Sequence, residues 1–171
     1  MHADLSPVIA ATAQWLTHAY PATGGALACA LSEVQARQAV TVAARLRYPT
    51  PMDAGLMGVS GPGGSARLDW ITGTDGMGGA DAEEEAWRTW VDEVVVSWAA
   101  CLLTDPALAA RAVAALTEGG TPAEFRRLLT PDDLDRRAAA LLRHPDLVAP
   151  VAALHRAELD TRLGPGQALV A

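Results

Sequence analysis

The sequence contains no lysine, so all 13 of its basic residues are arginines. Schiff-base and pyridoxal-phosphate enzymes need a lysine amine, and phosphate-loop nucleotidases need a lysine ammonium, so these classes are excluded. Cationic contacts must come from guanidinium groups, which stay protonated and bind carboxylate, phosphate or sulfate through two N–H groups at once. Asparagine is absent too and alanine is frequent, a composition typical of a GC-rich genome, which accounts for much of the missing lysine.

Aromatic residues and cysteines are scarce. The aromatic residues are five tryptophans, two tyrosines and one phenylalanine, so we expect a core of alanine, leucine and valine with tryptophans as its large side chains. Cys29 and Cys101 are far apart and have no metal-ligand spacing, so neither a zinc site nor a disulfide framework is indicated. We expect no metal and no cofactor.

The net charge of −7 argues against a nucleic-acid partner, because phosphate binding needs clustered positive charge. At 171 residues the chain fits one domain, which buries about 70% of the surface of the unfolded chain. The uncharged stretch 5–32 follows Asp4 and is interrupted by proline and glycine, which is atypical of a signal peptide or a membrane helix. We expect two buried helices there, no membrane partner and a cytoplasmic location.

Caps and prolines predict most of the helices. A hydroxyl residue precedes a proline at Ser6, Thr121 and Thr130, as is typical of a helix start. Such signals predict helices over residues 7–19, 106–117, 122–129, 131–143 and 147–163. Apolar periodicity predicts two more, over 33–47 and 82–103. The second is expected to be the central helix, because one stripe carries Trp87, Val91, Val94, Trp98, Cys101 and Leu102.

The segment before the central helix differs from the rest, since residues 55–79 hold nine of the 15 glycines. Within it, Ala66–Trp70 alternates apolar and charged residues like a half-buried strand, and Leu56–Ser60 would be its partner. Both a β-hairpin and an irregular loop fit this pattern. The predicted fold is therefore an all-α, single-domain bundle of about six or seven helices over 1–163, with an insertion at 55–81 and a loose tail at 164–171.

Charges four residues apart on a helix support each other, so we first set aside those with such a partner. The pairs are Glu33–Arg37, Glu84–Arg88, Arg88–Asp92, Asp132–Arg136, Asp133–Arg137, Arg156–Asp160 and Glu158–Arg162. The arginines without a local acid are Arg45, Arg47, Arg67, Arg111, Arg126 and Arg143, and the glycine-rich region adds Asp53, Asp69, Asp75 and Asp81. These arginines either pair with those aspartates across the fold or hold an anionic ligand.

The sequence thus leaves two functions open. In the first, a small helical protein of specialised metabolism binds or transforms a small anionic molecule, by cofactor-free elimination or cyclisation if it is an enzyme. Its ligand-binding residues would be Arg45, Arg47, Arg67 and Trp70, and its proton-transfer residues His155, Asp69 and Asp53. In the second, the chain is a non-catalytic helical subunit of a homo- or hetero-oligomer. Whether the protein is an enzyme stays open.

Overall fold

The computed structural model describes residues 4–74, 83–117 and 122–165. All regular secondary structure in these residues is helical, which confirms the all-α prediction. Asp75, Asp81, the cap predicted at Thr121 and the tail beyond Pro165 lie outside the described residues. The helices number more than expected and are α1 (Ser6–Ala19), α2 (Ala26–Arg47), α3 (Pro51–Ser60), α4 (Ala66–Thr72), α5 (Glu93–Thr104), α6 (Pro106–Leu116), α7 (Arg126–Leu129), α8 (Asp133–Ala138), α9 (Pro145–Ala152), α10 (Arg156–Arg162) and the 3-10 helices η2 (Ala86–Trp90) and η3 (Pro122–Phe125).

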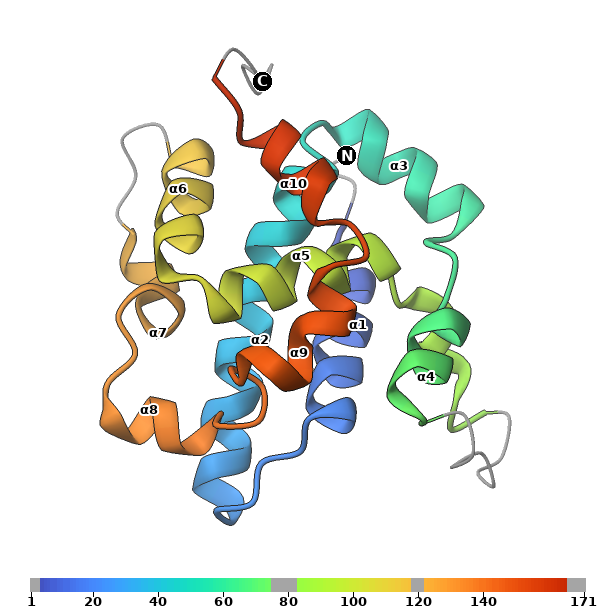
Figure 1. Ribbon diagram of the computed structural model, residues 1–171. Helices are drawn as coiled ribbons and strands as arrows, with labels where there is room; N and C mark the ends of the chain where they lie inside the picture. The colour runs from blue at the N-terminus through green and yellow to red at the C-terminus, as the bar shows by residue number, and fades with distance from the viewer. Residues whose placement is uncertain (1–3, 75–82, 118–121, 166–171) are drawn as a thin grey trace.

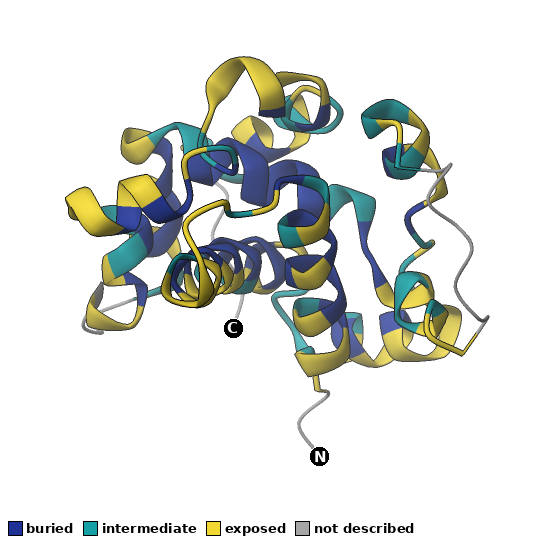
Figure 2. Ribbon diagram, turned by 90° about the horizontal axis from the view of Figure 1, so that it is seen from below, coloured by how far each residue is buried: buried dark blue, intermediate teal, exposed yellow. Residues whose placement is uncertain are grey.

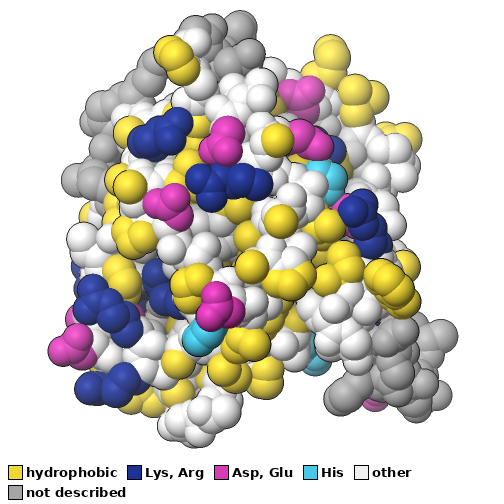
Figure 3. Space-filling model, in the orientation of Figure 1, with side chains coloured by type: hydrophobic (Ala, Val, Ile, Leu, Met, Phe, Trp, Pro, Cys, Tyr) yellow, Lys and Arg dark blue, Asp and Glu magenta, His cyan; other side chains and the backbone are white. Residues whose placement is uncertain are grey.

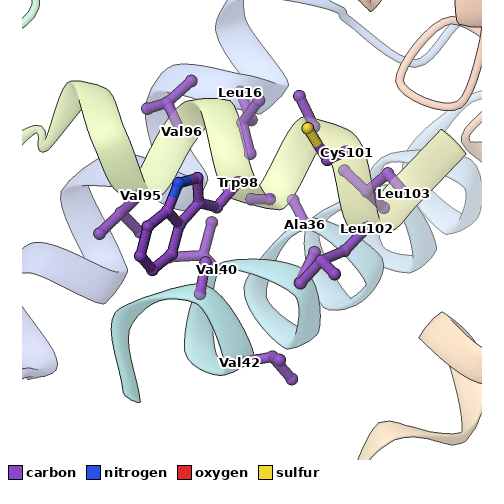
Figure 4. Packing of buried hydrophobic residues seen from close by; sticks show 14 of the residues in the cluster. Leu16, Ala36, Val40, Val42, Val95, Val96, Trp98, Cys101, Leu102 and Leu103 are labelled. Atoms are coloured by element: carbon purple, nitrogen blue, oxygen red, sulfur yellow. The ribbon is translucent and has the colours of Figure 1, made fainter. Parts of the chain in front are cut away.

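Two helices form the centre of the molecule. α5 crosses α2, α1 packs on α2 and α9 packs on α5, while α6 to α8 lie on one side of this group and α3 and α4 on the other (Figure 1). Buried ribbon runs through the middle, and the outer faces of the surrounding helices are exposed (Figure 2). Where α5 meets α2, Trp98 and Leu102 lie with Ala36 and Val40 (Figure 4). Small alanines on α2 allow the close packing that a core requires.

The tryptophans are distributed differently from the sequence-based expectation. Trp15 and Trp98 are buried, with 1% and 4% of their surface exposed, and Trp87 is half-buried. Trp70 and Trp90 are exposed, so the expectation that the tryptophans supply the large core side chains holds for part of the set. The remaining large buried side chains are mainly leucines, such as Leu16 and Leu102.

The central helix begins later than predicted, at Glu93 instead of residue 82. Asp92 is its N-cap: the Oδ1 atom accepts hydrogen bonds from the backbone N–H groups of Val94 and Val95 at 2.9 and 3.1 Å. Ala86–Trp90 before it forms a 3-10 helix, and Val91 is extended. The helix therefore starts at the aspartate cap, although the apolar periodicity continues backward to Trp87.

The predicted hairpin is wrong for residues 56–70, and the irregular loop that was its alternative is limited there to residues 61–65; residues 75–81 of the insertion lie outside the described residues. Leu56–Ser60 belongs to α3, which Thr50 and Asp53 start with a reciprocal capping box. Ala66–Trp70 belongs to α4, which ends at Gly73 in the left-handed conformation with φ 70°. In this short helix Leu68 is buried, whereas Arg67 and Trp70 face outward, so the alternating sequence belongs to a helix and not to a strand.

The helix predicted over 147–163 is divided into α9 and α10, with His155 between them. Pro150 lies inside α9 and donates no backbone hydrogen bond. Side chains of α5 bind the backbone groups at the break: Ser97 Oγ donates to the Ala152 carbonyl at 3.0 Å, and Trp98 Nε1 donates to the His155 carbonyl at 3.0 Å. The break is thus stabilised by tertiary contacts that the local sequence does not reveal.

Other helix boundaries also differ from the predicted ones. The helices predicted over 7–19 and 106–117 are confirmed within one residue. α2 begins at Ala26, before the predicted residue 33, and is 22 residues long. The segment 122–129 is divided between η3 and α7, and that over 131–143 is reduced to α8, followed by turns. In the part of the chain that the structure describes, no helix has both the length and the apolar character of a membrane span.

A buried polar network joins the segments on the α8 side. The guanidinium of Arg143 donates to Gln35 Oε1 at 2.5 Å, to the Leu103 carbonyl at 3.1 Å and to the Arg127 carbonyl at 2.7 Å. Asp135, fully buried, pairs with Arg127. Burial lowers the pKa of Arg143 to about 10, and the charge of Asp135 opposes this shift. Arg143, one of the arginines without a local acid, is therefore a structural residue.

Candidate functional site

Asp69 connects three elements. Its Oδ1 atom accepts from Trp15 Nε1 of α1 at 2.8 Å and from Arg88 NH1 of η2 at 2.9 Å, and Oδ2 accepts from Ser65 Oγ at 2.7 Å. Thr74 Oγ1 adds a further donor at 3.1 Å. Burial would raise the pKa of Asp69, but these hydrogen bonds and the charge of Arg88 outweigh it and lower the pKa. Asp69 is thus an anion whose oxygens are occupied, which suits a positioning residue and not a proton acceptor.

A cavity of about 330 Å³ lies beside these contacts, between α1 and η2. We call it the Trp87 cavity. It is lined by Gln14, Trp15, His18 and Ala19 of α1, Thr74 after α4, and Glu84, Glu85, Trp87 and Arg88 of the segment that contains η2. The His18 and Trp87 rings are in contact, with their centroids 5.5 Å apart and their planes tilted by 58°. Its lining therefore combines aromatic surface with groups of both charges.

One buried donor of Arg88, a residue that lines the cavity, has no hydrogen-bond acceptor in the part of the chain that the structure describes. Arg88 is held by Asp69 through NH1, and its guanidinium carbon lies 4.9 Å from the centroid of the Trp87 ring. Its Nε atom is buried and has no hydrogen-bond acceptor among the described residues. Its Nε atom lies 3.6 Å from Oε1 of Glu85, too far for a hydrogen bond. A buried N–H without an acceptor raises the free energy of the folded state, so such atoms are rare in folded proteins.

His155 is bound on both sides by carboxylates. Its Nε2 lies 2.8 Å from Glu93 Oε1, and its Nδ1 lies 2.9 Å from Glu158 Oε1. Arg67 NH1 donates to the same Glu93 oxygen at 3.2 Å. Burial would lower the pKa of His155, but the hydrogen bonds and charges of Glu158 and Glu93 outweigh it and raise the pKa. With both nitrogens occupied, His155 has none free to accept a substrate proton.

The two candidate arginines at the end of α2 also have partners. Arg45 NH2 donates to Glu124 Oε1 at 3.2 Å, and its guanidinium carbon lies 5.7 Å from the centroid of the Phe125 ring. Arg47 Nε lies 4.0 Å from Asp92 Oδ2. The face of the molecule in Figure 3 likewise carries its arginines in small groups near acidic side chains, without a broad area of one sign.

Asp92 has a second neighbour in Tyr48, whose hydroxyl donates to the Asp92 carboxylate. Burial and this hydrogen bond raise the pKa of Tyr48. The tyrosine therefore stays neutral and acts as a donor to the cap of α5.

The other two candidates lie on short helices. Asp53 completes the cap of α3, where its Oδ2 accepts from the Thr50 hydroxyl at 2.7 Å. Trp70 projects from α4 with 75% of its surface exposed. The structure brings Arg47 and Asp53 to one shallow surface depression beside α3, and it joins Arg67 to His155 through Glu93. It does not gather the candidates into one site.

Reasoning from sequence missed the Trp87 cavity because its walls are distant in the chain. The helical pairs Glu84–Arg88 and Arg88–Asp92 that the spacing predicts are wrong: η2 is a 3-10 helix, and Arg88 pairs with Asp69 and Glu85. The pairs Glu33–Arg37 and Arg156–Asp160 are confirmed. The signal available in the sequence was His18, in one helical row with Trp15.

Among the described residues, no group of three metal-ligating side chains is close enough to hold a metal ion. Comparison of the chain with protein-family models, with curated proteins and with solved structures gave no match. What the protein does is therefore inferred from its own residues.

Proposed function

We propose that the protein binds a small organic molecule in the Trp87 cavity, and that its role is binding and not covalent chemistry. The observation that carries the proposal is the buried Nε of Arg88, a hydrogen-bond donor without an acceptor in the described residues at the wall of a partly aromatic cavity. Ligand sites are typically concave and mostly apolar, with a few polar groups that fix orientation. A volume of about 330 Å³ is near the lower end of their range, which fits a small ligand.

The contacts of the three proton-transfer candidates favour binding over catalysis. His155 is bound by two carboxylates, Asp69 accepts from four donors and Asp53 caps a helix. An anion bound by Arg45, Arg47 or Arg67 would compete with Glu124, Asp92 or Glu93, which already pair with them. The proposed ligand therefore lies in the Trp87 cavity and contacts Arg88.

A cavity-filling substitution tests this proposal. Ala19 lines the cavity at the end of α1 and makes no side-chain hydrogen bond, so Ala19→Phe should occupy the space without removing a polar contact. We expect fragments that bind the wild-type protein, measured by ligand-observed NMR, to bind Ala19→Phe at least about tenfold more weakly, a loss of about 1.4 kcal/mol. Ala10→Phe, at an exposed position of the same helix, is the control and should bind normally. Equal binding by all three proteins would contradict the proposal.

A second candidate function, a subunit that self-associates, is favoured by α3. Met52, Leu56 and Val59 recur at helical spacing and are 75%, 64% and 90% exposed. Apolar residues on one face of a surface helix usually contact another surface. We propose a second copy of this chain as the partner, because α3 carries a single charged residue, Asp53, which is engaged in its cap. The net charge of −7 repels two copies overall, so the contact depends on this weakly charged helix face.

A further inference from the structure

The charges around the Trp87 cavity do not cancel. Its lining includes Glu84, Glu85 and Arg88, and the guanidinium of Arg88 is already paired with Asp69 at 2.9 Å. These four side chains are one guanidinium and three carboxylates, so 1 − 3 gives a net charge of −2. A ligand that carries a positive charge is therefore attracted, and an anion is repelled.

The remaining lining specifies two more properties of the ligand. The Trp15, His18 and Trp87 rings offer aromatic surface, which suits a flat, largely apolar body. The guanidinium of Arg88, whose Nε–H has no hydrogen-bond acceptor among the described residues, favours an oxygen or another acceptor on the ligand. We therefore expect one ligand to carry a positive charge, an aromatic ring and a hydrogen-bond acceptor.

We propose that the ligand is a small aromatic amine, protonated at neutral pH, that also bears a hydroxyl or carbonyl oxygen. Its ammonium group contacts the carboxylates of Glu84 and Glu85, and its oxygen accepts from the guanidinium of Arg88. This inference rests on the function proposed above, and it reverses the charge expected from the sequence, which was that of an anion.

Three probes that share a phenol ring test the charge of the ligand. They are 4-(2-aminoethyl)phenol, which is cationic, 2-(4-hydroxyphenyl)ethanol, which is neutral, and 3-(4-hydroxyphenyl)propanoate, which is anionic. At low salt and about pH 8, above the ordinary pKa of histidine, titration calorimetry or NMR should give an affinity for the amine about tenfold higher than for the alcohol, and the anion should bind least. Added salt should reduce the difference, because it screens exposed charges.

Substitution of the carboxylates identifies the groups responsible. Glu84→Gln combined with Glu85→Gln should remove most of the preference for the amine and leave binding of the alcohol within about twofold, since it removes charge with little change in shape. Glu33→Gln combined with Glu158→Gln is the control, because it removes the same charge from positions outside the lining. The control should keep the preference.

The outcomes separate this inference from the proposed function. If the three probes bind equally, or the anion binds best, and Ala19→Phe still abolishes binding, the amine assignment is wrong and the cavity remains the ligand site. If the preference for the amine persists in the Glu84→Gln, Glu85→Gln protein, the assignment is wrong as well. If no probe binds and no fragment is lost on Ala19→Phe, both proposals are wrong.

Discussion

At the scale of single residues, the polar side chains that resembled catalytic groups are held in structural contacts. His155 is the clearest example, because Glu93 and Glu158 each approach one of its ring nitrogens. A histidine between two carboxylates is stabilised in its protonated form, in which both nitrogens donate. It therefore links the start of α5 to the start of α10.

This contact makes stability depend on pH. The pKa of folded His155 is raised above the ordinary value of 6.5, so its stabilising contribution is complete below that value and is lost as pH rises through the folded pKa. We expect His155→Gln to destabilise the protein clearly at about pH 5.5 and less at about pH 9. Urea unfolding at both pH values measures the difference. The exposed His144→Gln variant is the control. An effect of His155→Gln that grows with pH would refute the assignment.

At the scale of helices, side chains of α5 bind the backbone where α9 ends and α10 begins. Trp98 fills the contact with α2 through its ring and binds the backbone between α9 and α10 through its Nε1 atom. Ser97 next to it bonds both sides of the same break, accepting from the His155 N–H at 3.0 Å and donating to the Ala152 carbonyl. One turn of α5 therefore supports both the core and the C-terminal helices.

Removal of the Trp98 side chain tests this role. We expect Trp98→Ala to lower the free energy of unfolding by about 3 to 5 kcal/mol, the usual cost of emptying a large aromatic site in a core. Trp70→Ala, at a site 75% exposed, should cost less than about 1 kcal/mol. Denaturant unfolding of both variants gives the comparison. Similar losses in the two variants would contradict the central position of Trp98.

At the scale of the whole molecule, the two sides of the bundle differ. α7 and α8 are joined to α2 by the network around Arg143 and Asp135, whereas α3 contributes little to the core, with Ala54 and Met57 as its buried residues. The apolar stripe of α3 is therefore available to a second copy of the chain. A contact built on one helix of 10 residues is small, so the association should be weak.

Sedimentation velocity at increasing concentration measures this association. We expect a dissociation constant on the order of 100 µM for the wild-type protein, and a monomer at all concentrations for Leu56→Ser combined with Val59→Ser. Thermal unfolding of the variant should be nearly unchanged, because both side chains are exposed. A wild-type protein that stays monomeric would exclude the second copy as the occupant of α3.

The sequence by itself determined the helical class and several helix ends. Pro7 and Pro106 act locally, through a missing N–H at the first turn of a helix, so their consequences for α1 and α6 could be predicted. Apolar periodicity likewise located α2 and the central part of α5. Such signals depend on residues within a few positions of each other.

Tertiary structure alone decided where the charged and aromatic groups meet. Against the effect of burial, the pKa of Asp69 is lowered by hydrogen bonds from Trp15, 54 residues away, and from the nearby Ser65, and by the charge of Arg88, 19 residues away. The break at His155 persists because α5 binds its backbone groups. Hydrogen bonds act over a few ångströms, so a distant partner becomes relevant after folding has brought it near. The Trp87 cavity, and the buried Arg88 donor that has no hydrogen-bond acceptor among the described residues, are products of such contacts and were not predicted from local patterns.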